Sequence, residues 1–151
     1  MSGYEQLGRA IEERDDALGH DTGQARNFAM RLVEQFEKQL GAPGDAIHLL
    51  PAGEVLKGGH TTHTIGESIE RSAAGFTLGM EIDFPQYVTG VRLNMAPSGG
   101  SSWKVNVDGT PITEVLAPLG DWSHFVGDVA DHLRQAVTLH APPERVAFRS
   151  R

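Results

Sequence analysis

The sequence predicts a single α+β domain in which helices from both ends of the chain pack on a central antiparallel sheet. Three observations support this prediction. Residues 76–116 hold alternating apolar and polar runs separated by turn-forming residues, and apolar stripes at helical spacing lie on both sides of this stretch. The chain of 151 residues is also long enough to bury a substantial core. We therefore expect one domain over residues 1–151.

The first 41 residues form the N-terminal helical segment. Tyr4, Leu7, Ile11 and Leu18 mark a narrow apolar stripe, and a wider stripe runs from Ala25 to Leu40. Residues 19–23 contain two glycines and two good capping residues, which predicts a break between two helices. Residues 41–44, which include Gly41 and Pro43, are typical of a helix end.

The sheet is predicted within residues 46–116. Residues 46–51 are a short apolar run, and residues 53–57 are a candidate for its antiparallel partner. Strict alternation over residues 76–84, 87–95 and 103–107 predicts strands with one buried face, and residues 112–116 follow an Asp-Gly turn. We expect a meander within a sheet of about four to six strands. The predicted apolar face comprises Phe76, Leu78, Met80, Ile82, Phe84, Val91, Leu93, Val105 and Val107.

Residues 121–140 are predicted to form a C-terminal helix that packs on the sheet. Asp121 is the expected cap, and the apolar side chains from Trp122 to Val137 recur at helical spacing. Trp103 and Trp122 lie in phase with their apolar faces, which favours a place in the core. Residues 141–151 form a tail that begins with an alanine followed by two prolines.

Charge and composition limit the classes of function. The formal net charge of −7 opposes nonspecific binding to phosphate, so we expect no nucleic-acid partner. The absence of cysteine removes disulfides and thiolate metal sites. We find no apolar run long enough for a membrane span and no signal-peptide pattern, which favours a cytoplasmic protein without a membrane partner.

One group of residues has the composition of a metal site. His60, His63 and Glu67 offer imidazole and carboxylate ligands suited to zinc or a similar divalent ion. On a helix their spacing would bring them to one face, but neighbouring glycines and threonines oppose a stable helix, and residues 58–72 are left open between helix and strand. A polar loop with ordinary histidines and no cofactor is the competing interpretation.

Four charged residues point away from the predicted apolar face of the sheet. Glu81 and Asp83 lie two residues apart on one strand, and Arg92 and Lys104 occupy outward positions on later strands. Paired carboxylates can perform acid–base chemistry, but alternation favours a solvated sheet face.

These observations lead to three functional hypotheses. The first is a non-enzymatic interaction module, such as an adaptor, a chaperone or an inhibitor or immunity-type protein, that binds a protein through this polar face or through a sheet edge. The alternative is a metal-dependent or small-ligand enzyme built around His60, His63 and Glu67. The third is a homo-oligomeric structural component.

Overall fold

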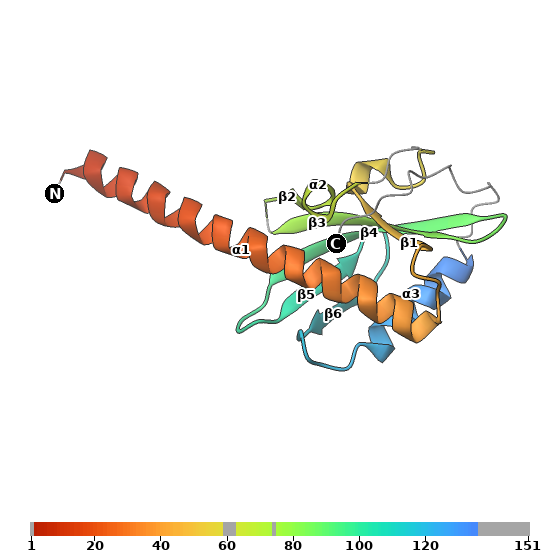
Figure 1. Cartoon of the computed structure of the whole chain (residues 1–151). Coiled ribbons are helices and arrows are strands. Elements are labelled where there is room, and N and C mark those ends of the chain that lie inside the picture. Colours follow the sequence, from red (N-terminus) through yellow and green to blue (C-terminus); the bar gives the residue numbers. More distant parts are fainter. Residues whose placement is uncertain (1, 59–62, 74, 136–151) are drawn as a thin grey trace.

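The computed structural model describes residues 2–58, 63–73 and 75–135 and confirms the α+β class (Figure 1). The predicted end of the last helix and the tail lie within residues 136–151, outside the described residues. In chain order the elements are α1 (Gly3–Leu40), β1 (Ile47–Leu50), the 3₁₀ turn η1 (Ala52–Glu54), α2 (Ile65–Ser68), β2 (Glu70–Arg71), β3 (Phe76–Asp83), β4 (Val88–Pro97), β5 (Trp103–Val107), β6 (Thr113–Leu116) and α3 (Ser123–Gln135).

The strands form one six-stranded antiparallel sheet, and five of them follow the order β1-β3-β4-β5-β6. The predicted meander from β3 to β6 is therefore confirmed. β1 and β2 pair with different parts of the same strand, because β1 lies beside residues 79–82 of β3 and β2 lies beside residues 76–77. Residues 53–57 are not the strand that we expected. They belong to η1 and to a turn in which Leu56 has a positive φ of 61°.

α1 is one continuous helix of 38 residues and not the predicted pair of helices. The helix ends at the predicted place, because Gly41 adopts the left-handed conformation, and it begins where the Ser2 side chain accepts a hydrogen bond from Glu5 N. The expected break at residues 19–23 is absent. Glycine inside a helix costs roughly 1 kcal/mol but does not block its hydrogen bonds as proline would, and residues 3–41 contain no proline.

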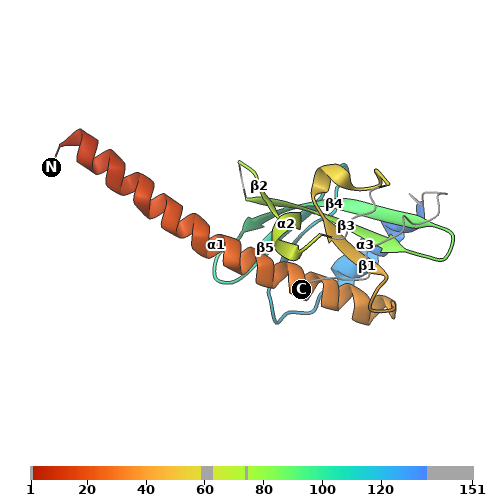
Figure 2. The same cartoon turned by 45° about the horizontal axis from the view of Figure 1, so that its top comes forward.

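The second half of α1 and α3 cover one face of the sheet, whereas the first half of α1 projects beyond it (Figures 1 and 2). Phe28 lies at the centre of the contact. Its ring centroid is 4.9 Å from that of Trp122 and 5.7 Å from that of Trp103, and both tryptophans are buried as predicted. Thus Phe28 joins the helix, the sheet and the start of α3 in a single aromatic cluster.

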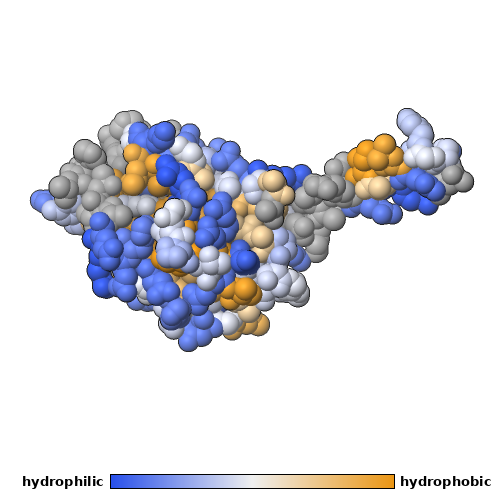
Figure 3. All heavy atoms as spheres, turned by 180° about the vertical axis from the view of Figure 1, so that it is seen from behind, coloured by the Kyte–Doolittle hydropathy of each residue, from blue (hydrophilic) through white to orange (hydrophobic). Residues whose placement is uncertain are grey.

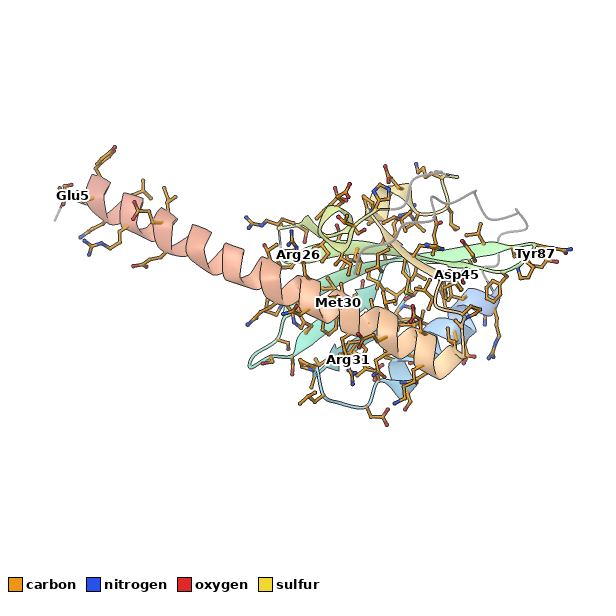
Figure 4. All side chains as sticks on the ribbon, viewed as in Figure 1. Glu5, Arg26, Met30, Arg31, Asp45 and Tyr87 are labelled. Carbon is orange, nitrogen blue, oxygen red and sulfur yellow. The ribbon has the colours of Figure 1, made fainter. Side chains whose placement is uncertain are left out.

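Eight of the nine predicted apolar-face residues are buried. Phe84 is the exception, with 47% of its surface exposed. It follows β3 directly and both accepts and donates backbone hydrogen bonds with Tyr87 at the tip of the β3–β4 hairpin. The alternation continues past the end of β3 to Phe84, but this tip extends beyond the helices that the structure describes, and none of the described elements covers Phe84 (Figure 4).

The other face of the sheet is partly covered by residues 51–57. Val55 is buried against two glycines of neighbouring strands, Gly79 in β3 and Gly90 in β4. A Cβ atom built at Gly79 would lie 2.5 Å from Val55 Cγ2, and one built at Gly90 would lie 2.9 Å from Val55 Cγ1. The absence of side chains at these two positions therefore makes room for Val55.

We expect the substitution Gly90→Ala to destabilise the protein by about 1–3 kcal/mol, because the new methyl group would overlap both Val55 and the Met80 carbonyl oxygen. Gly127→Ala is the matched control. That glycine is exposed in α3, and a methyl group there would have no neighbouring atom within 4 Å, so alanine should raise stability slightly. Urea unfolding of both variants measures the difference, and equal effects would contradict the packing described.

Candidate functional site

The clearest convergence of metal-ligating side chains among the described residues lies where β6 meets the start of α3. Glu114 comes from β6, and His124 and Asp128 lie one turn apart on α3. His124 Nδ1 is 3.0 Å from Glu114 Oε1 and 3.5 Å from Asp128 Oδ2. One ligand atom from each residue falls within 4.8 Å of the other two. We call this group the β6–α3 triad.

Local structure explains why the triad forms. Trp122 is fully buried and donates from Nε1 to the Ala117 carbonyl at 2.7 Å, which holds the connection between β6 and α3. Asp121 accepts a hydrogen bond from Ser123 N at 2.9 Å, and this bond lowers the pKa of the Asp121 carboxyl. Asp121 was expected to cap α3, but the Trp122 carbonyl accepts the first backbone hydrogen bond of the helix, so Asp121 lies one residue before the cap position and its bond to Ser123 N forms a turn that leads into α3. His124 follows two residues after Trp122, so the buried indole positions it beside β6.

The two carboxylates favour the protonated form of His124. The hydrogen bond with Glu114 raises the pKa of the imidazole first, and the negative charges of Asp128 and Glu114 raise it further. Glu114 Oε2 is buried and has no hydrogen-bond partner among the described residues. Unsatisfied buried carboxylate oxygens are rare, because desolvation without a partner is costly. The triad thus combines an excess of negative charge with an unsatisfied acceptor.

The metal group expected from the sequence is described only in part. His60 lies outside the described residues, so the complete group of His60, His63 and Glu67 stays a hypothesis. His63 Nε2 lies 2.8 Å from Glu54 Oε2. Glu67 belongs to the first turn of α2, where its backbone and side chain exchange hydrogen bonds with Thr64. These hydrogen bonds lower the pKa of the Glu67 carboxyl. Both residues therefore have structural partners.

The structure places the two acidic and the two basic residues expected on the polar face in different environments. Glu81 is 3% exposed under residues 51–57, where its carboxylate accepts a hydrogen bond from Leu56 N at 2.6 Å, and Asp83 Oδ2 lies 3.0 Å from His48 Nε2. The expectation that Glu81 faces solvent was therefore wrong, because sequence alternation does not show which loop crosses a face. Arg92 and Lys104 are exposed, although Arg92 also donates to the Ala52 carbonyl at 2.8 Å.

An exposed apolar stripe on the projecting half of α1 is a second candidate site. We call residues 3–20 the arm. Tyr4, Leu7 and Ile11 are 88%, 62% and 52% exposed. Figure 3 shows apolar side chains grouped on this helix away from the body of the molecule, and Glu5 marks its far end in Figure 4. A helix that keeps an apolar stripe in water is typical of a docking element.

A cavity of about 260 Å³ lies at the root of the arm. Phe28 and Arg31 of α1, Trp103 of β5 and Pro118 contribute to its lining. Arg31 Nε donates to the Pro118 carbonyl at 3.0 Å across its wall. The side chains that line it are mostly uncharged, so it resembles a gap between packed elements more than a site for chemistry.

No protein-family model, curated protein or solved structure matches this chain. In the part of the chain that the structure describes, no helix combines the length and apolar character required to cross a bilayer. Any functional conclusion must therefore be argued from the sites themselves.

We expect the pKa of His124 to lie above the ordinary value of 6.5. A pH titration monitored by NMR, in the presence of a chelator, measures it. Glu114→Gln should lower that pKa, because the neutral amide replaces the charged carboxylate that stabilises the imidazolium. Because the pKa of His124 is higher in the folded protein than in the unfolded chain, protonation stabilises the folded state at pH values below the pKa of the unfolded chain. This contribution disappears as the pH rises through the pKa of the folded protein. A His124 pKa at or below 6.5 would contradict the contacts described.

Proposed function

We propose that this protein is a protein-interaction module that binds its partner through the arm of α1. The observation that carries the proposal is the exposure of Tyr4, Leu7 and Ile11 on a helix whose other half is anchored in the core. A helix of about 18 residues spans roughly 27 Å. The arm thus presents an apolar stripe well away from the sheet.

The stripe faces the same side of α1 as the residues that pack on the sheet. Within each half of the helix the apolar residues are three or four positions apart, and two heptads separate Ile11 from Ala25. The residues are Tyr4, Leu7 and Ile11 in the arm and Ala25, Phe28 and Leu32 in the buried half. Such spacing keeps side chains on one side of a helix. Ala25, Phe28 and Leu32 are buried in the core that α1 forms with the sheet and α3. A partner that covers the stripe would therefore continue the sheet layer beyond its end.

The charges of the arm indicate the chemistry of the partner. Residues 3–20 contain two arginines and five acidic residues, a net charge of −3. Two arms side by side would bring like charges together, which opposes pairing with a second copy. A helix with an apolar stripe and basic flanks would bury the stripe and neutralise this charge. We therefore favour a basic amphipathic helix as the bound element.

The open part of the second sheet face supplies a further polar surface. Arg92 and Lys104 are exposed there, next to Asn94 and Asn106, whose side chains are joined by a hydrogen bond of 3.3 Å. The short strand β6 ends the described sheet on this side. A protein partner that reached this surface would meet positive charge, in contrast to the negative arm, so the two surfaces suit different parts of a partner.

We expect the double substitution Leu7→Glu and Ile11→Glu to weaken partner binding by at least about tenfold, since burying each apolar side chain is worth roughly 1.5–3 kcal/mol. A binding assay with a synthetic basic amphipathic peptide measures the change in affinity. A second measurement compares the amount of protein that the parent and the variant each recover from an extract of the source cells. Glutamate preserves helix propensity, and circular dichroism should show an unchanged helix content.

The matched control is Gln6→Glu with Arg9→Gln, which changes the net charge by the same amount on the opposite side of the arm. Its binding should stay within about twofold of the parent, because no stripe residue is altered. Equal binding by the stripe variant and the parent would refute the docking role. If light scattering showed a parent dimer that the stripe variant abolished, the partner would be a second copy and not a basic helix.

A further inference from the structure

We propose that the β6–α3 triad of Glu114, His124 and Asp128 binds a divalent first-row transition ion, with Zn²⁺ as the reference ligand. The proposal is independent of the arm, because the triad lies on β6 and α3. One imidazole nitrogen and two carboxylates form a donor set suited to Zn²⁺ and its neighbours, and the chain has no thiolate to compete.

The geometry fits a shared ion. Ligand atoms at about 2.0–2.2 Å from Zn²⁺ lie roughly 3.0–3.5 Å from one another in tetrahedral or octahedral coordination. The distances from His124 Nδ1 to the Glu114 and Asp128 carboxylates, 3.0 Å and 3.5 Å, already match two edges of such a polyhedron. The third separation stays within 4.8 Å, and Asp128 is exposed enough to close it by rotating its side chain.

Charge also favours a divalent ion over a proton. Two carboxylates and a neutral imidazole carry a charge of −2, which a proton on His124 only halves, whereas a divalent cation neutralises it completely. A cation held by both oxygens of Glu114 would also satisfy Oε2, which is buried without a hydrogen-bond partner among the described residues.

Because one side of the triad is open to solvent, a bound ion would have both protein and water ligands. The His124 side chain is 77% exposed, so solvent would supply the remaining ligands. An ion at this position would join β6 to the start of α3, two elements that are otherwise held together by Trp122 and the core. Binding should therefore stabilise the folded protein as well as introduce a coordinated water.

Calorimetric titration of tag-free, chelator-treated full-length protein with Zn²⁺ at about pH 7.5 tests the proposal. We expect one leading binding event that His124→Ala and Glu114→Gln each weaken by at least about tenfold, the effect of losing roughly 1.4 kcal/mol or more of ligand binding. Asp128→Asn should weaken it as well, and this variant should disturb folding little, because asparagine has the same shape as aspartate and the side chain is 44% exposed. Circular dichroism checks that each variant is folded.

Two control histidines separate this site from other sources of binding. His132→Ala changes the same helix outside the triad and should leave the affinity within about twofold. His63→Ala tests the group that the sequence suggested. Loss of the leading event in His63→Ala with retention in His124→Ala would overturn the proposal and assign the ion to the other group. Absence of Zn²⁺ binding by the parent, or equal affinity in the parent and all three triad variants, would also overturn it.

Discussion

The contact of Phe28 with Trp103 and Trp122 determines the arrangement of both candidate sites. It fastens the second half of α1 to the sheet, and this attachment directs the first half into solvent. The same contact buries Trp122, which holds the start of α3 where His124 meets Glu114. Loss of a buried aromatic ring typically costs about 3–5 kcal/mol. Damage at Phe28 would therefore disturb surfaces that lie on separate parts of the molecule.

Local signals in the sequence were sufficient for most of the sheet and the core. The period of two in β3, β4 and β5 identified their buried faces, because a strand with one covered face must alternate. It failed at Phe84, where the alternation persists but the described parts of the covering helices leave the side chain 47% exposed. The sequence also suggested a break in α1, since glycines and capping residues at 19–23 resemble a helix boundary. The structure shows that these residues continue the helix.

The candidate sites depend on contacts that local patterns do not encode. Burial of Glu81 follows from the path of residues 51–57, which pass over β3 because Gly79 and Gly90 leave room for Val55. The β6–α3 triad needs the packing of a strand against a helix that follows it in the chain. A part of its signal was available, because His124 and Asp128 are spaced for one helix face, whereas Glu114 had no such signal. The exposed stripe of the arm was visible in the sequence, but its exposure was not.

The continuity of α1 has a consequence for the thermodynamics of recognition. A short isolated helix is marginal in water, because forming its first turn costs conformational entropy before any hydrogen bond compensates for it. In α1 that first turn is already formed by the buried half, so the arm extends an existing helix and needs no nucleation of its own. A partner would meet a preorganised surface. Its affinity would then reflect the contacts formed more than the ordering of the arm, unlike segments that fold only on binding.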